Sequence, residues 1–144
     1  AIIGGASKED ANHMYNFGLN LGISFQLMDD WLDVYSDPKV FGKKTGGDIV
    51  ENKKTYLLIN AIDKAEGIDR LQLEGWINKT TFDEHEKINA IKDIYQKLGI
   101  DKMTLNKAEE YSKIAFEELD KVSIQSEQKM ALKSLGESLL SRIK

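Results

Sequence analysis

The feature that most constrains this sequence is a helical pattern with almost no breaks. Its 144 residues contain a single proline, Pro38, and almost no stretch in which apolar and polar residues alternate. Strict alternation predicts a half-buried strand, whereas apolar residues spaced by three and four predict an amphipathic helix. Because nothing competes with the helical spacing over any long segment, the sequence predicts an all-α fold.

The spacing of the apolar residues predicts a helical bundle of five or six helices joined by short loops. The first helix, at 8–36, carries one apolar stripe: Met14, Gly18, Leu21, Phe25, Met28, Leu32 and Tyr35. We expect Pro38 to end it and Gly67 to end a second helix at 48–66. A further helix is predicted to start with Thr81 or Asp83 as its cap and to end at Gly99. Two more are predicted at 101–124 and 126–142, the last facing inward at Leu132, Leu135 and Leu139. Residues 68–77 are expected to be a short, poorly defined helix or connection.

Composition excludes several classes of protein. A chain of this length that is 41% hydrophobic can build one core, so residues 1–144 are predicted to form a single domain. The net charge of -4 argues against nucleic-acid binding, which needs a basic surface. There is no cysteine, and no apolar run approaches the roughly 20 residues that cross a bilayer. The sequence therefore predicts a soluble, cytoplasmic protein without a membrane span.

Polar side chains gather on one face of the first predicted helix. At 100° per residue, four of them fall within about 100° of one another: Gln26, Asp29, Asp30 and Asp33. Neighbouring carboxylates raise one another's pKa values unless a cation lies among them. Oxygen ligands on a rigid helix suit Mg²⁺, which usually takes one or two carboxylates together with water and phosphate oxygens. The alternative is a solvated acidic face, which a chain with 24 acidic residues can also produce.

A cationic loop follows this helix. Residues 41–47, with the sequence FGKKTGG, combine two lysines with three glycines, and glycines let ammonium and backbone groups approach phosphate oxygens. Asp48 is expected to cap the next helix and to place Lys53 and Lys54 in its first or second turn, where the helix dipole disfavours cations unless an anion is bound. The arrangement indicates a site for a metal-bound polyphosphate, although exposed lysines without a ligand explain the same pattern.

The residues FQLMDDWLD followed by FGKKTGGDIVENKKTYL resemble a known pair of motifs. They are similar to the second aspartate-rich motif and the lysine loop of the trans-type isoprenyl diphosphate synthases, the polyprenyl synthetase family. The resemblance covers residues 18–57, and the flanking helices are compatible with the C-terminal half of that family. The family fold is an all-α barrel of about twice this length, so the resemblance implies a partial isoprenoid synthase fold without its N-terminal helices.

The resemblance implies a role for each motif residue. It assigns Mg²⁺ to four carboxylates, the last through a metal-bound water: Asp29, Asp30, Asp33 and Asp48. It assigns substrate contacts to three side chains, of which the lysines would reach diphosphate oxygens: Gln26, Lys43 and Lys53. Lys44 is the alternative to Lys43, and Asn52 stands where many members have glycine.

The implied activity is Mg²⁺-dependent condensation of an allylic diphosphate with isopentenyl diphosphate by a homodimeric parent enzyme. Metal ions would help the diphosphate leave as pyrophosphate, and the allylic carbocation would alkylate the double bond of isopentenyl diphosphate before a proton is lost. The first aspartate motif and the arginine pair of the family are not found in these 144 residues. We therefore expect the isolated chain to lack turnover, and we assign no catalytic acid, base or nucleophile to it.

Two alternatives stay open. A non-catalytic helical partner or regulatory subunit could retain the motif by descent. A terpene cyclase of related fold would also ionise an allylic diphosphate, although cyclases usually carry a second metal motif with Asn, Ser and Glu. His13 and His85 are interpreted as hydrogen-bonded or exposed side chains rather than as ligands or bases.

Overall fold

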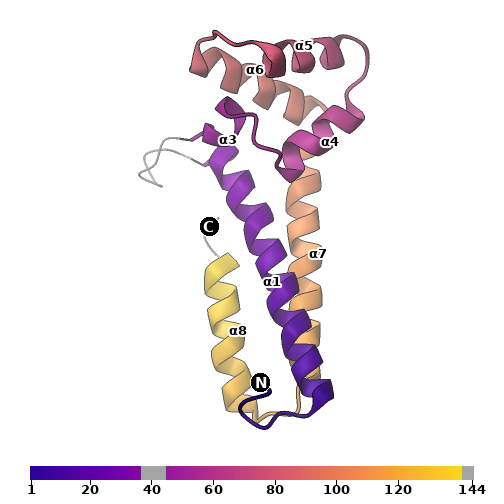
Figure 1. Cartoon of the computed structure of the whole chain (residues 1–144), viewed down its shortest axis with the longest axis vertical. Helices are drawn as coiled ribbons and strands as arrows, with labels where there is room; N and C mark the ends of the chain where they lie inside the picture. The colour runs from indigo at the N-terminus through magenta and orange to yellow at the C-terminus, as the bar shows by residue number, and fades with distance from the viewer. Residues whose placement is uncertain (37–44, 141–144) are drawn as a thin grey trace. The chain divides into compact units, whose positions relative to one another are not determined.

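The computed structural model describes residues 1–36 and 45–140 of the chain, and Figure 1 shows its helices. The chain divides into two compact units, one made of Ala1–Met28 with Asn106–Lys144 and the other of Asp29–Leu105. Every regular element of the described ranges is a helix, which confirms the all-α prediction. Across those ranges, no helix combines the length and the apolar character that crossing a membrane requires. The single domain over 1–144 stays a prediction.

The first unit packs three helical segments around a small apolar core. The N-terminal part of α1 (Lys8–Tyr35), the C-terminal part of α7 (Ile100–Lys121) and α8 (Ser126–Leu140) run alongside one another in Figure 1. Phe17, Ala115 and Leu119 are buried in this core, and Leu132 packs against them. Gly136 lets α8 approach closely, because an added Cβ there would lie 3.1 Å from the ring of Phe116.

Among its described residues, the second unit contains the end of α1, the start of α7 and, between them, α3 (Gly47–Val50), α4 (Tyr56–Lys64), α5 (Gly67–Asn78) and α6 (Glu84–Lys97). Helix α6 packs against α3, α4 and α5. Its Ile91, Ile94 and Tyr95 lie in one buried cluster with Ile49 of α3 and Leu57 of α4. Helix α6 therefore packs against the buried side of the short helix α3.

Several predicted helix ends are confirmed. Helix α1 ends at Tyr35, one residue before the predicted end. The carboxylate of Asp83 caps α6 by accepting a hydrogen bond from the Glu86 N–H at 3.0 Å. Gly99 follows α6 with a φ of +68°, a conformation that glycine adopts readily.

The prediction of one helix at 48–66 is wrong, because two helices, α3 and α4, occupy this range. Asn52 interrupts the helical path with a φ of +52°. Thr55 then starts α4 as its N-cap, and its hydroxyl accepts a hydrogen bond from the Leu58 N–H at 3.3 Å. Gly67 begins α5 instead of ending the preceding helix, and α5 is a regular helix of 12 residues where the sequence predicts a short, poorly defined helix or connection.

The predicted inward positions are only partly right. On α1 the buried side chains include Phe17, Ser24 and Leu27, whereas Gly18 is exposed. The hydroxyl of Ser24 donates to the Ala108 carbonyl oxygen at 2.7 Å, so α1 also presents a polar contact to α7. On α8, Leu135 is 56% exposed and does not face the core as predicted.

Candidate diphosphate and metal site

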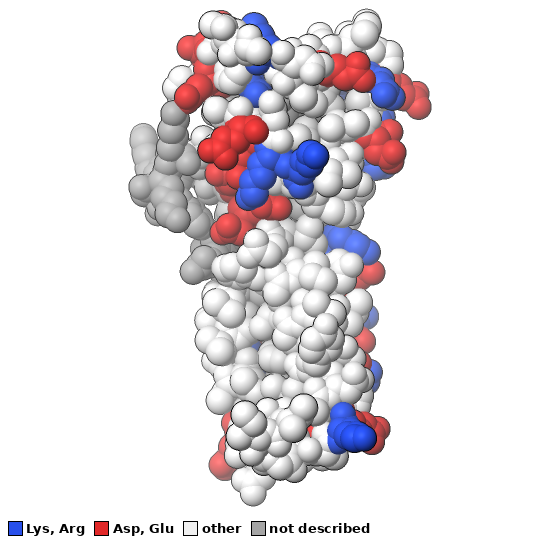
Figure 2. Space-filling view, in the orientation of Figure 1, with Lys and Arg blue, Asp and Glu red and all other residues white. Residues whose placement is uncertain are grey.

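Three carboxylates and one ammonium group meet in the second unit, where α1 ends and α3 begins. The Nζ of Lys53 donates to Oδ2 of Asp48 at 2.8 Å and to Oδ1 of Asp30 at 3.2 Å. Asp30 belongs to α1, Asp48 to α3 and Lys53 to the connection between α3 and α4. Figure 2 shows acidic and basic side chains next to one another on the surface around α3. The structure thus brings together residues that the sequence places 23 positions apart.

Asp33 holds the start of α3 against the end of α1. Its Oδ2 accepts a hydrogen bond from the Asp48 N–H at 2.9 Å, and its carbonyl oxygen accepts one from the Gly46 N–H at 2.6 Å. Gly46 is the N-cap of α3, so the prediction that Asp48 caps this helix is wrong. Asp48 lies in the first turn instead, and Asp33 fixes its backbone.

Burial dominates the titration of the two aspartates of α1 at this site. It raises the pKa of Asp30, an effect that the hydrogen bond and charge of Lys53 oppose. It also raises the pKa of Asp33, against the hydrogen bond from the Asp48 N–H. The pKa of Lys53 is raised in turn, chiefly because its ammonium donates to Asp48. Burial therefore disfavours the charged form of Asp30 and Asp33, and a bound cation would favour it.

Other predicted site residues fall elsewhere. Lys53 and Lys54 precede α4 and are exposed, so their predicted place in the first turns of a helix is wrong. Gln26 and Asp29 are exposed on α1, with Gln26 in the first unit and Asp29 in the second. Lys43 and Lys44 lie outside the described residues.

The donor set fits a hard cation. In the part of the chain that the structure describes, no three acidic or histidine side chains are placed to share one metal ion. Mg²⁺, however, usually takes only one or two protein carboxylates and fills its shell with water and phosphate oxygens. Asp30 and Asp48 already face one cation, the ammonium of Lys53. The chemistry of these oxygens therefore suits Mg²⁺, and the metal assignment stays a prediction.

Two residues next to this site carry contacts that the sequence analysis did not assign. Lys87 of α6 is fully buried, and its Nζ donates to the side-chain oxygen of Asn52 at 2.7 Å. A signal for Lys87 existed, because it precedes Ile91 by one helical turn and Ile94 by two, in phase with the apolar stripe of α6. Asn52 has a positive φ of +52°, a backbone conformation that glycine adopts more readily than asparagine.

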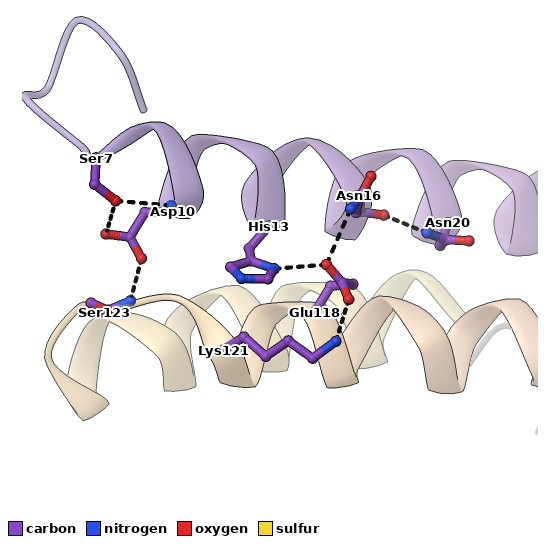
Figure 3. A network of polar contacts seen from close by, with 8 residues as sticks. All are labelled: Ser7, Asp10, His13, Asn16, Asn20, Glu118, Lys121 and Ser123. Carbon is purple, nitrogen blue, oxygen red and sulfur yellow. Dashed lines mark hydrogen bonds and ion pairs between the residues drawn. The ribbon is translucent and has the colours of Figure 1, made fainter.

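A second polar network lies in the first unit (Figure 3). Glu118 accepts hydrogen bonds from His13 at 2.8 Å, from Asn16 at 3.2 Å and from Lys121. These donors lower the pKa of Glu118 to about 2, with His13 the largest contributor. His13 is thus hydrogen-bonded, in agreement with its structural interpretation.

The comparison with known proteins identifies the family. The family model for polyprenyl synthetase matches residues 1–98. A geranylgeranyl diphosphate synthase from Sulfolobus acidocaldarius is 38% identical over 146 aligned residues, which cover 100% of this chain and 43% of that protein. A solved geranylgeranyl pyrophosphate synthase structure matches with a TM-score of 0.87 and 36% identity, over 99% of this chain and 44% of that one.

A further solved structure was obtained with ligands. It is a geranylgeranyl pyrophosphate synthase from Corynebacterium glutamicum in complex with isoprenyl diphosphate and magnesium, with 29% identity and a TM-score of 0.82. The match covers 97% of this chain and 40% of that protein. This chain therefore spans less than half the length of the relatives it matches. The family model covers most of the sequence and the matched structures share its fold, so the chain belongs to the polyprenyl synthetase family.

Proposed function

We propose that this chain supplies the part of a prenyltransferase that binds Mg²⁺ and an allylic diphosphate, and that the whole protein condenses this substrate with isopentenyl diphosphate. The observation that carries the proposal is the cluster of Asp30, Asp48 and Lys53, in which one ammonium group bridges two carboxylates. The magnesium and isoprenyl diphosphate in the Corynebacterium relative support the same chemistry. A homodimeric and cytoplasmic whole protein stays part of this proposal.

The residues of the proposed site, which include this cluster, have different roles. Asp29, Asp30, Asp33 and Asp48 hold the metal, directly or through water, and Gln26 and Lys43 contact the substrate. Bound Mg²⁺ neutralises the diphosphate and so lowers the barrier to its departure. Lys53 carries an exposed ammonium that can turn from the carboxylates to a diphosphate oxygen. Asp33 also keeps Asp48 in place through the Asp48 N–H.

Isothermal titration of the chain with inorganic pyrophosphate and Mg²⁺ tests the proposal. We expect Asp29→Ala to remove most of the heat of binding while the protein stays folded, and Asp33→Ala to remove it as well. Asp63→Ala is the matched control, because Asp63 is exposed on α4 in the same unit. Equal heats for all four proteins would favour the non-catalytic helical partner over the enzyme.

A condensation assay tests the expectation that these 144 residues have no turnover by themselves. The single DDxxD motif of the sequence supplies only one set of carboxylates, and the homoallylic site implied by the family is not among its motifs. We expect no Mg²⁺-dependent product from an allylic diphosphate and isopentenyl diphosphate. Product formed by a preparation free of any longer synthase would contradict this expectation.

A further inference from the structure

Lys87 is a fully buried lysine whose ammonium is held by neutral oxygens. Its Nζ donates to the Val50 carbonyl oxygen at 3.0 Å and to the Asn52 side-chain oxygen at 2.7 Å, and it lies 4.3 Å from the centre of the Phe82 ring. Burial lowers the pKa of Lys87. An ammonium group is costly to bury, so a lysine at this position needs these contacts.

The two oxygens that Lys87 binds belong to the turn that leads to Lys53. Val50 is the last residue of α3, and Asn52 is the residue whose positive φ redirects the chain. The Asn52 amide nitrogen also donates to the Ile77 carbonyl oxygen of α5 at 3.0 Å. The Asn52 side chain thus contacts both α5 and α6, and Asn52 directly precedes Lys53 in the chain.

The neighbour of Lys87 on α6 holds the other end of α3. A Cβ added to Gly46, the N-cap of α3, would lie only 2.6 Å from Cδ1 of Ile88. Ile88 therefore packs against the start of α3 while Lys87 binds its end. Two successive residues of α6 fix a helix of four residues that carries Asp48.

We propose that Lys87 is a positioning residue of the diphosphate site: by binding Val50 and Asn52, it fixes the turn from which Lys53 reaches Asp30 and Asp48. This inference rests on the proposed function, because it takes Lys53 and Asp48 as ligand-binding residues. Lys87 is buried behind the turn and acts through Lys53 without touching the substrate. A hydrophobic side chain could fill the same space, but it could not satisfy the Val50 carbonyl and the Asn52 amide oxygen.

A double-mutant cycle between Lys87 and Lys53 tests the inference. Lys87→Met keeps the length of the side chain and removes its ammonium. We expect it to weaken binding of Mg²⁺ pyrophosphate about tenfold, the size of effect typical of residues that orient ligands. In a Lys53→Met background we expect Lys87→Met to have a clearly smaller effect on this affinity, because only its hold on α3 and Asp48 is then left to lose. The same loss in both backgrounds would overturn the inference, because a general loss of structure does not depend on Lys53.

A second measurement needs no ligand. In ¹H–¹⁵N NMR spectra recorded well below the melting temperature, Lys87→Met should displace the amide signals of Lys53 and Asp48. Lys97→Met is the matched control, since Lys97 lies on the same helix with a side chain that is 66% exposed. It should leave both signals and the affinity unchanged. A folded Lys87→Met protein with native signals and native affinity would refute the positioning role.

Asn52→Gly provides a variant that leaves the Lys87 side chain intact. Glycine accepts the positive φ of this turn but removes one of the two oxygens that Lys87 binds. We expect smaller displacements of the same two amide signals and a smaller loss of affinity. If Lys87→Met fails to fold, this variant decides, and native signals and affinity for it would overturn the inference.

The cycle also separates this inference from the proposed function. If Lys53→Met binds Mg²⁺ pyrophosphate as tightly as the native chain, the proposed role of Lys53 fails. The NMR signals of Lys53 and Asp48 then decide the inference alone. Displaced signals in Lys87→Met support its hold on the turn, and unchanged signals contradict it.

Discussion

Helix α1 carries a polar network near each of its ends, one in each compact unit, and the two networks differ in how well their carboxylates are satisfied. Glu118 in the first unit accepts three hydrogen bonds, which lower its pKa to about 2. In the second unit, burial raises the pKa values of Asp30 and Asp33. The charged form of the carboxylate is thus stabilised at Glu118 in the first unit and destabilised at Asp30 and Asp33 in the second.

The difference separates a structural network from a candidate site. Around Glu118 the donors come from both α1 and α7, so the charge joins two helices of one unit (Figure 3). Around Asp30 and Asp48 the cation is Lys53, whose side chain is 51% exposed and free to move to another anion. Burial disfavours the charged form of Asp30 and Asp33, and a bound cation would stabilise that form, which makes this end of α1 the candidate site.

The largest effect on stability is expected from Gly46→Ala, which changes only the second unit, where Asp30 and Asp33 lie at the C-terminal end of α1. The new Cβ would meet Ile88 at 2.6 Å, and the φ of +85° disfavours any L-residue other than glycine. We expect a loss of about 2–4 kcal/mol in the free energy of unfolding. Urea denaturation measures it.

Gly75→Ala is the matched control for this substitution. Gly75 lies within α5, and a Cβ added there meets no atom within 4 Å. Alanine at this position should gain about 0.5–1 kcal/mol, because it lowers the cost of forming a helix. Equal effects of the two substitutions would show that the start of α3 is not held as tightly as the contact with Ile88 implies.

The second prediction compares two substitutions of a carboxylate by its amide, Asp30→Asn in the second unit and Glu118→Gln in the first. Asp30→Asn should weaken binding of Mg²⁺ pyrophosphate about a hundredfold, because an amide cannot replace a carboxylate ligand. It should change the free energy of unfolding by no more than about 0.5 kcal/mol, because Lys53, its partner, is largely exposed. Glu118→Gln should do the reverse, lowering the melting temperature without affecting pyrophosphate binding. Titration and scanning calorimetry of both variants measure the affinity and the melting temperature. A loss of pyrophosphate binding in Glu118→Gln would contradict the distinction between a structural network and a binding site.

Sequence reasoning located the aspartate end well because helical spacing is regular. The stripe and Pro38 place the end of α1 to within one residue, and aspartates at positions i, i+1 and i+4 of a helix lie within about 100° of one another. The contact between Asp30 and Lys53 could not be derived in this way. It depends on the path of the chain after Val50, which a single residue, Asn52, redirects.

The same limit explains the errors at 48–67. An asparagine in a positive φ is not visible in a pattern of apolar residues, so the pattern predicts one helix where the chain forms α3 and α4. Glycine predicts a helix end, but Gly67, with its φ of +52°, follows the extended residue Glu66 and begins α5. The burial of Lys87 was indicated only by its phase with the apolar stripe of α6, and the oxygens that it binds could not be derived, since they depend on packing between segments distant in sequence.

The third prediction concerns pH and the Glu118 network. The pKa of Glu118 is about 2 in the folded protein and 4.5 in its ordinary state. The folded state therefore binds fewer protons between these values, so the stability that Glu118 contributes is complete above about pH 4.5 and is lost as the pH falls towards 2. Melting curves of the native chain and of Glu118→Gln should differ at neutral pH and converge in acid. Curves that stay equally far apart at every pH would contradict the assigned hydrogen bonds.

The smallest effects are expected from two helix caps, one in each unit. The hydroxyl of Ser7 accepts a hydrogen bond from the Asp10 N–H at 3.0 Å, whereas that of Thr55 accepts one from the Leu58 N–H at 3.3 Å. Thr55 is 7% exposed, so Thr55→Val leaves a buried N–H without a partner and should cost about 1 kcal/mol. Ser7→Ala should cost about 0.5 kcal/mol, because water can replace the hydroxyl near the surface. Urea denaturation measures which substitution lowers the free energy of unfolding more, and a larger loss from Ser7→Ala would show that burial does not decide the strength of these caps.

The two caps should also differ in their effect on binding. Thr55 directly follows the lysine pair, so Thr55→Val should lower pyrophosphate affinity, which Ser7→Ala should leave unchanged.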